Sequence, residues 1–264
     1  IYVLLKEVVD NSIDEFSAGF GKQIQITVTD KEVSVRDFGR GIPLGSVVKA
    51  VSILNTGGKY DSKGYKKSVG LNGVGLKAVN ALSSNFYVEA YRDGMCAYAE
   101  FSAGKLRNEG QKETKEKNGT YVKFIPDENL FVGYNYNIEF VESMIKNYSY
   151  LKKGLTLNLN GTPYISKNGL LDLIKDNADG ALHSTPVYHT IKEGPIEAEV
   201  AMMWTKGKEK CFTFTNGLQQ SEGGTSLTGV KTAITNFIKK QFKGEFDGEM
   251  ARTGLVYAVS CKIP

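Results

Sequence analysis

The sequence has few of the residues on which several enzyme classes depend. Its 264 residues include only two histidines and three cysteines. The scarcity of histidine argues against zinc hydrolases with two or three His ligands and against nucleophilic triads that use His. The cysteines, Cys96, Cys211 and Cys261, have no metal-ligand spacing. A reduced cytoplasmic compartment is the simplest explanation of their odd number.

Long apolar runs and targeting signals are also missing. No run approaches ~18 consecutive apolar residues, so we expect no transmembrane helix and no membrane partner. No signal peptide is visible. The chain begins at Ile1 without a methionine and already inside a predicted helix, so we expect a piece of a longer protein.

What is present favours two domains with sizeable cores. The length exceeds one typical domain of ~100–150 residues, and 41% of the residues are hydrophobic. A change of composition near residues 176–186 predicts a boundary that separates domain 1–182 from domain 183–264. The net charge of +4 is mild, and it permits a partner that carries phosphates without demonstrating one.

Amphipathic spacing predicts a first helix over Leu4–Phe16. Glu7, Asn11 and Asp14 follow one another at i, i+4 and i+7, so they share the face opposite the apolar stripe, with Glu15 at its edge. This spacing places a carboxylate base and an amide oxygen one turn apart. An ordinary solvated face explains a single helix equally well, so the interpretation depends on two loops further along the chain.

The first of these loops is Asp37–Pro43, which follows a predicted strand directly. A carboxylate such as Asp37 can accept a hydrogen bond from an exocyclic amine like that of adenine, and Arg40 can stack on a base or pair with a carboxylate. The second loop, Gly70–Gly75, precedes a predicted helix, and its three glycines favour a bound phosphate. The alternatives are a turn with a surface ion pair and a flexible connection.

Two other nucleotide-binding motifs do not fit. Residues 73–78 satisfy G-x-G-x-x-A, but a dinucleotide fold requires a buried strand immediately before this motif. The preceding residues 59–68 are polar and contain four lysines. No G-x-x-x-x-G-K-[S/T] motif occurs, so the chain is not a P-loop protein.

Periodicity also predicts the other elements. We expect helices over residues 47–54, 76–82, 138–150, 170–175 and 230–242. We expect strands over residues 24–28, 33–35, 86–92, 97–102, 121–125, 156–160, 197–204, 211–214 and 255–263. An exposed charged link is expected over residues 108–119, and a Gly-rich loop over residues 216–229.

The helix and the two loops together resemble the nucleotide-binding site of the Bergerat (GHKL) ATPase superfamily, which contains gyrase, the ninety-kilodalton heat-shock chaperones, histidine kinases and MutL mismatch-repair proteins. Three further motifs narrow the resemblance to the ATPase region of the B-type subunit of bacterial type II DNA topoisomerases, gyrase B or topoisomerase IV ParE. They are Gly57-Gly58-Lys59-Tyr60-Asp61, Gly119-Thr120 and Glu222-Gly223-Gly224-Thr225. The implied fold is α+β: a Bergerat-type α/β sandwich with a mostly antiparallel mixed sheet and helices on one face, followed by a smaller α/β transducer domain.

The resemblance implies an ATP-binding and ATP-hydrolysing domain with ATP and Mg²⁺ as cofactors. Glu7 matches the general base that activates water, Asn11 the Mg²⁺ ligand, and Asp37 the carboxylate that reads adenine. The residues expected around the adenine are Glu15, Arg40, Gly41, Ile42, Pro43, Arg92 and, through water, Thr120. Those expected at the phosphates are Lys59 and Tyr65 of the lid and the turn Gly70, Leu71, Asn72, Gly73, Val74 and Gly75.

The resemblance also implies partners. These are DNA, reached through the full-length enzyme, an A-type subunit (gyrase A or ParC), and a second ATPase domain that dimerises on ATP binding. An ATPase of the chaperone or MutL type is the alternative, which residues 57–61 and 222–225 disfavour. A module that binds nucleotide without hydrolysis is a third possibility, disfavoured by the presence of both Glu7 and Asn11.

The sequence departs from the family pattern at two positions. Ser226 stands where the family often has histidine after Gly-Gly-Thr, and Phe38 replaces a polar residue before Gly39. The family's transducer lysine lies in a Gln-Thr-Lys loop, which we expect after Pro264, and its N-terminal arm is expected before Ile1. The chain is therefore expected to hold most nucleotide contacts without the complete catalytic assembly.

Overall fold

The structure, a computed structural model, describes residues 1–54, 73–220, 222–242 and 247–263. The chain forms two compact units. The first comprises Ile1–Ser149 and Gly154–Ile165, and the second comprises Tyr150–Lys153 and Ser166–Pro264. The units therefore divide earlier in the chain than residue 182, where the change of composition placed the domain boundary.

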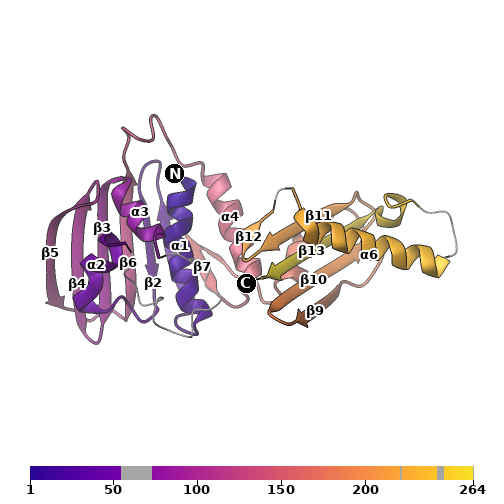
Figure 1. The fold of residues 1–264 in the computed structure, drawn as a ribbon, viewed down its shortest axis with the longest axis horizontal. Helices are drawn as coiled ribbons and strands as arrows, with labels where there is room; N and C mark the ends of the chain where they lie inside the picture. The colour runs from indigo at the N-terminus through magenta and orange to yellow at the C-terminus, as the bar shows by residue number, and fades with distance from the viewer. Residues whose placement is uncertain (55–72, 221, 243–246, 264) are drawn as a thin grey trace. The chain divides into compact units, whose positions relative to one another are not determined.

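The first unit is built on one eight-stranded sheet (Figure 1). Its strands are β1 (Gln23–Val28), β2 (Val33–Asp37), β3 (Ser83–Arg92), β4 (Met95–Ser102), β5 (Lys105–Glu113), β6 (Gly119–Pro126), β7 (Thr156–Leu159) and β8 (Thr162–Tyr164). The spatial order is β5-β4-β3-β6-β2-β1-β7-β8, and all neighbours are antiparallel except β1 and β7. This order places the end of β2 beside the start of β6.

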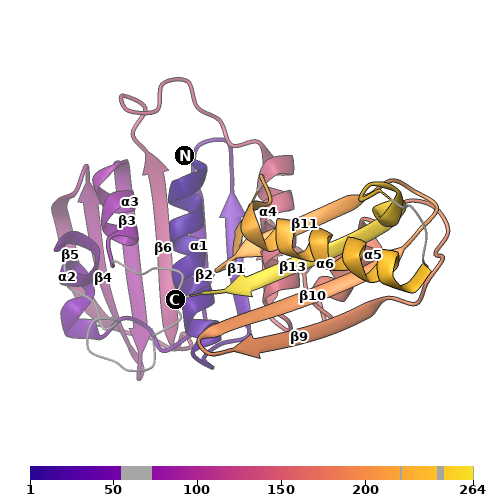
Figure 2. The same ribbon diagram turned by 45° about the vertical axis from the view of Figure 1, so that its right-hand side comes forward.

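Helices cover one face of this sheet (Figure 2). They are α1 (Tyr2–Ser17), α2 (Val47–Ser52), α3 (Gly75–Ala81) and α4 (Ile138–Leu151), and a 3₁₀ turn, Leu44–Ser46, precedes α2. The apolar stripe of α1 packs Leu5, Val9 and Ile13 into the core, where each is fully buried. Burying a side chain of this size contributes about 1.5–3 kcal/mol, so the stripe fixes which face of α1 remains available for chemistry.

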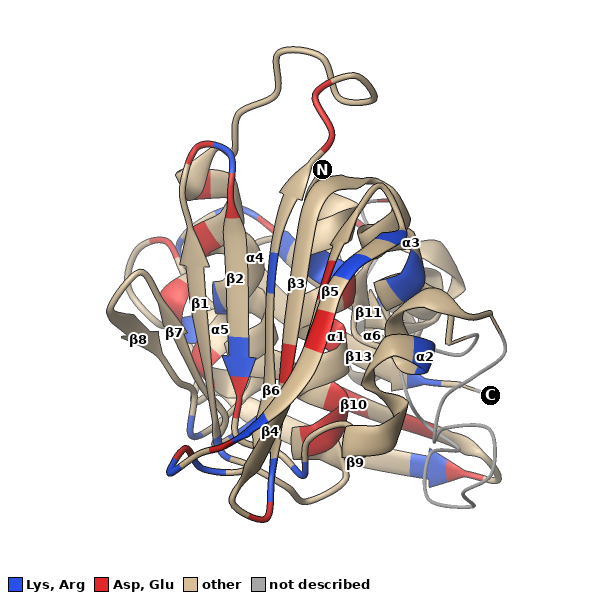
Figure 3. Ribbon diagram, turned by 90° about the vertical axis from the view of Figure 1, so that its left-hand side faces the viewer, with Lys and Arg blue, Asp and Glu red and all other residues tan. Residues whose placement is uncertain are grey.

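The opposite face of the sheet carries polar and aromatic side chains. Along β3, Phe86 and Val88 are fully buried, whereas Tyr87, Glu89 and Tyr91 alternate with them and are half-buried. Figure 3 shows acidic and basic residues interspersed along the strands of this sheet. The sheet therefore has one core-facing side and one side of mixed polarity, as is common for antiparallel sheets.

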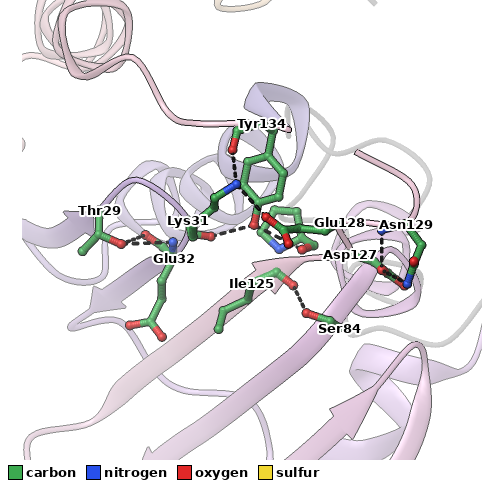
Figure 4. A network of polar contacts seen from close by, with 10 residues as sticks. Thr29, Lys31, Glu32, Ser84, Ile125, Asp127, Glu128, Asn129 and Tyr134 are labelled. Carbon is green, nitrogen blue, oxygen red and sulfur yellow. Dashed lines mark hydrogen bonds and ion pairs between the residues drawn. The ribbon is translucent and has the colours of Figure 1, made fainter. Parts of the chain in front are cut away.

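A polar network fixes the turn between β1 and β2 against the segment after β6 (Figure 4). Lys31 Nζ lies 2.6 Å from Glu128 Oε1 and 4.4 Å from the ring centre of Tyr134. The Tyr134 hydroxyl lies 2.9 Å from the carbonyl oxygen of Lys31. This network stands where β2 begins and β6 ends, so it lies at the other end of these strands from Asp37.

The second unit has a five-stranded sheet with a helix on each face. Its elements are α5 (Leu170–Asp176), β9 (Val187–Glu193), β10 (Ile196–Trp204), β11 (Lys210–Thr215), β12 (Leu218–Gln219), α6 (Gly224–Phe242) and β13 (Leu255–Lys262). The strand order is β12-β11-β13-β10-β9, in which only β11 and β13 pair in parallel. Val256 and Ala258 of β13 pack with α5, whereas Leu255 and Tyr257 pack with α6. The near-continuous apolar run of β13 follows from this two-sided burial.

The predicted α+β class, with a largely antiparallel sheet and helices on one face, is confirmed. Two local predictions are wrong. Residues 108–113 belong to strand β5 rather than to a link, although they are exposed as expected, and both β12 and the start of α6 at Gly224 lie within the expected loop 216–229. The edge strands β8 and β9 were not predicted. The burial of Leu170, Leu173 and Ile174 in the core of the second unit explains why α5 belongs to that unit.

In the part of the chain that the structure describes, no helix is both long and apolar enough to span a bilayer.

Candidate functional site

The exposed side of α1 presents two of the predicted residues. Glu7 and Asn11 lie one turn apart and are both half-buried. Asn11 Nδ2 donates to the backbone oxygen of Glu7 at 2.7 Å, which fixes the orientation of the amide. Asp14 does not share this exposure, because only 4% of it is accessible, so the alternative of an ordinary solvated face does not hold at this position.

The start of α3 meets Glu7 directly. A Cβ atom added to Gly75 would overlap the Glu7 carboxylate, so the glycine allows α3 and α1 to approach at this point. Gly73 has a φ of +58°, a conformation that suits glycine, and Val74 is 40% exposed. The structure therefore brings the predicted base beside the C-terminal half of the predicted phosphate turn. Lys59, Tyr65, Gly70, Leu71 and Asn72 lie outside the described residues.

Asp37 is the most enclosed of the described residues that are predicted to contact the nucleotide. It is 5% exposed at the end of β2. Its Oδ1 accepts backbone N–H bonds from Gly39 at 2.9 Å and from Thr120 at 3.2 Å. The hydroxyl oxygen of Ser12 on α1 lies 3.4 Å from Oδ2. The carboxylate is thus oriented from three sides, and Oδ2 keeps capacity to accept a further donor.

Burial makes this carboxylate a weaker acid than usual. Desolvation raises the pKa of Asp37 to about 6, although the N–H bonds from Gly39 and Thr120 and the neighbouring Arg36 oppose the shift. Glu15 adds a smaller contribution in the raising direction. At neutral pH the group is mostly ionised, and it is a hydrogen-bond acceptor in an enclosed environment. A carboxyl with a strongly shifted pKa at a strand end is a sound candidate for a functional group.

Glu15 and Arg40 form a two-pronged ion pair beside Asp37. Arg40 Nε and Nη2 donate to the two carboxylate oxygens at 3.1 and 3.0 Å, and the backbone N–H of Arg40 adds a third bond at 3.1 Å. The guanidinium also stacks on Phe20, 4.3 Å from the ring centre. A Cβ on Gly39 would come within 2.8 Å of the Glu15 side chain. The pair therefore links the loop after β2 to α1. Its three hydrogen bonds distinguish it from a simple surface ion pair within a turn.

The remaining predicted residues surround the same loop. Gly41 has a φ of +77°, and a Cβ there would lie 2.6 Å from the carbonyl of Tyr91 and 2.9 Å from that of Gly119. Ile42 packs against the core of the first unit, and Pro43 is exposed. Arg92 ends β3 and is half-buried, with Nε 3.7 Å from Asp93. Thr120 reaches Asp37 through its backbone N–H.

Sequence reasoning missed several residues of this region. Ser12 approaches Asp37, and the buried Arg36 binds the backbone around it. Lys77 on α3 donates to the carbonyl of Gly73, and burial lowers the pKa of its ammonium group. A polar Ser12 inside an apolar stripe and a lysine two residues after Gly75 were the available signals, but neither points to a particular partner.

The kinds of side chain at this site determine which metal ion it could hold. Among the described residues, no three His, Cys, Asp or Glu side chains gather as a metal site. Asn11 offers an amide oxygen, which is a ligand type that Mg²⁺ accepts. Mg²⁺ commonly takes only one or two protein ligands and completes its shell with water and substrate phosphates. The residues present therefore fit an ion that arrives with a nucleotide rather than one held in a protein cage.

Comparison with protein families agrees with this arrangement. A family model described as "Histidine kinase-, DNA gyrase B-, and HSP90-like ATPase" matches residues 1–130. A second model, described as DNA gyrase B, matches residues 169–264. The two matches lie in the first and second compact units, respectively.

Individual relatives give the same result. The B-type subunit of DNA topoisomerase 4 from Borreliella burgdorferi is 42% identical over all of this chain, which spans 44% of that relative. The DNA gyrase B protein of Enterococcus faecalis is 33% identical, and the chain spans 46% of it. The crystal structure of the 43K ATPase domain of Thermus thermophilus gyrase B, solved with an aminocoumarin, is 26% identical with a TM-score of 0.79, covering 99% of this chain and 75% of that one. The chain thus spans less than half of these full-length relatives.

Proposed function

Because the chain belongs to the family of B-type subunits of type II topoisomerases and spans their ATPase region, we propose that it binds and hydrolyses ATP at the site formed by α1, the end of β2 and the start of α3. The observation that carries the proposal is the enclosure of Asp37. Its carboxylate is ionised, oriented by Gly39 and Thr120, and able to accept through Oδ2. This is the arrangement needed to accept the exocyclic amine of adenine.

The rest of the site supplies what hydrolysis requires. We assign Glu7 as the general base for the water that attacks the terminal phosphate, a role typically worth about 10²–10⁴ in rate. Asn11 would hold Mg²⁺, which when bound neutralises charge on the phosphates. Gly75 lies against Glu7 and directly follows Gly73 and Val74, in keeping with a phosphate turn. Lys59, Tyr65 and Gly70–Asn72 remain predicted members of the lid and turn.

Around the adenine, Glu15 and Arg40 border the pocket and hold its loop. Gly41 allows that loop to approach β3 and β6 closely. Ile42 and Pro43 contribute the apolar floor, and Arg92 the mouth. For Thr120 we retain the predicted water-mediated role of its hydroxyl alongside the direct bond from its N–H.

At the level of the whole protein, we propose an ATP-driven type II topoisomerase that passes one DNA duplex through another. The first unit is then the ATP-binding domain and the second unit the transducer. The expected partners are DNA, an A-type subunit and a second ATPase domain that associates when ATP binds. The names of the relatives support this proposal, as do the matches to both family models.

The test separates binding from turnover. Glu7→Gln should lower ATP turnover by about 10²-fold or more and leave ATP affinity nearly unchanged. Asp37→Asn should weaken ATP affinity by about tenfold, because an accepting oxygen is exchanged for an amide that presents a donor on one side. Calorimetry measures affinity, and phosphate release from the full-length protein measures turnover. Normal turnover by the Glu7 variant would exclude it as the base.

A further inference from the structure

Arg36 occupies an unusual position beside the site. It precedes Asp37 in β2, is 8% exposed, and lies on the sheet face opposite the helices. Its guanidinium carbon lies over two aromatic rings, 4.6 Å from the ring centre of Phe38 and 4.3 Å from that of Tyr91. Contacts with two rings restrain the guanidinium more than one would. Phe38 therefore contacts the guanidinium of Arg36 directly.

The planar guanidinium binds two backbone segments at once. Its Nη1 donates to the carbonyl oxygen of Asp37, and its Nη2 donates to that of Lys117 at 2.5 Å. Lys117 lies two residues before the start of β6. A Cβ on Gly119 would overlap both the Asp37 carbonyl and Arg36 Nη1, so the backbones of the two segments touch here. Arg36 therefore ties the end of β2 to the entry of β6.

These two segments are the ones that orient the Asp37 side chain. Thr120, directly after Gly119, donates its N–H to Oδ1, and the chain beyond Asp37 supplies the N–H of Gly39. We propose that Arg36 is a positioning residue for nucleotide binding, which holds the β2 end and the β6 entry in the register that presents the Asp37 carboxylate to adenine. This inference rests on the proposed ATP site and adds to it a residue that contacts neither base nor phosphate.

The positive charge of Arg36 gives the proposed positioning role a second measurable effect, which is on the pKa of Asp37. The groups that face Asp37 are Ser12 and Glu15 from α1, Arg36 from its own strand, and the N–H groups of Gly39 and Thr120. Among these, Arg36 is the cation, and it holds the pKa of Asp37 below the value that burial and Glu15 would otherwise produce. Without this charge, Asp37 would remain protonated to a higher pH and would accept adenine less well.

Two substitutions separate charge from geometry. Arg36→Lys keeps a cation but loses the planar guanidinium fork, whereas Arg36→Gln loses both the charge and the fork. Arg107→Gln is the matched control, because this arginine is exposed on β5 of the same sheet. The probe is the non-hydrolysable analogue adenylyl imidodiphosphate with Mg²⁺, titrated into the protein by calorimetry between pH 5.5 and 8.5.

We expect both Arg36 variants to bind the analogue about tenfold more weakly at pH 8 than the wild type, and the control to bind normally. The midpoint pH below which affinity falls should rise by about one unit in Arg36→Gln and stay unchanged in Arg36→Lys. A purely structural role would weaken binding without moving the midpoint. If Arg36→Gln does not fold, the affinity of Arg36→Lys for the analogue tests the proposal.

The outcomes are distinguishable. Wild-type affinity in both variants overturns the proposal for Arg36 alone, as does a midpoint that stays fixed in a folded Arg36→Gln. No binding of the analogue by the wild-type protein overturns the ATP site, and the role of Arg36 with it.

Discussion

Replacing Asp37 by asparagine should stabilise the nucleotide-free protein at neutral pH, although the same change weakens nucleotide binding. The reason is the cost of keeping a charge inside the first unit. Burial raises the pKa of Asp37 from 3.8 to about 6. One pKa unit corresponds to about 1.4 kcal/mol, so the ionised carboxylate costs the folded state about 3 kcal/mol at most.

The sign follows from proton linkage. Because the pKa is higher in the folded state, the folded protein binds more protons than the unfolded chain between about pH 4 and pH 6. The contribution of Asp37 to stability is therefore largest below about pH 4 and is lost as the pH rises through about 6. The Asp37→Asn variant does not lose stability in this way as the pH rises, because its amide does not ionise. Its amide oxygen can still accept the N–H bonds of Gly39 and Thr120.

The measurement is the urea dependence of unfolding at pH 4.5, 6 and 8, followed by circular dichroism. The stability difference between variant and wild type should be small at pH 4.5 and grow to about 1–3 kcal/mol at pH 8 in favour of the variant. Asp30→Asn is the control, because Asp30 is an exposed residue in the turn after β1. A variant that is less stable than wild type at pH 8, or a difference independent of pH, would refute the reasoning.

Two further substitutions test the packing around α1. Gly75→Ala should lower ATP turnover at least tenfold, because its Cβ would overlap the Glu7 carboxylate and displace it. The test is the steady-state ATPase rate of the variant, with a melting curve as the control for folding. Normal turnover by the variant would contradict the contact between Gly75 and Glu7. Tyr148→Phe should lower the free energy of unfolding by about 1–3 kcal/mol, because it removes the 2.5 Å bond to the buried Asp10. Unchanged urea unfolding would show that Lys6 alone satisfies Asp10.

The sequence predicted those elements in which one face is buried. The alternation of Ile24, Ile26 and Val28 matches the observed burial of β1, and the helical stripe of α1 matches its core contacts. Strand β5 escaped prediction because it lies at the sheet edge and buries almost nothing, so its sequence has no alternation to detect. The start of α6 escaped because Gly223 and Gly224 are typical of a loop, although the helix begins at the second of them.

The candidate site was predictable where a motif carries the chemistry, and not where tertiary packing does. The position of Asp37 at a strand end followed from the motif, whereas its contacts with Ser12 and Thr120 depend on α1 and β6 meeting at that point. The same limit explains why the burial of Asp14 and Asp10 could not be predicted from the sequence. Helical periodicity assigns them to faces, but only the position of the neighbouring elements determines that both are buried.

The edges of the two sheets differ in how readily they would accept another strand. The first sheet ends in β5, which is exposed and rich in lysine, arginine and glutamate, and in β8, which is three residues long and contains Pro163. On the second sheet, β12 has two residues, whereas β9 has seven. Val187 and Ile191 of β9 are 56% and 50% exposed. Charge, proline and shortness discourage pairing between chains, so self-association of this protein through added strands is expected to begin at β9.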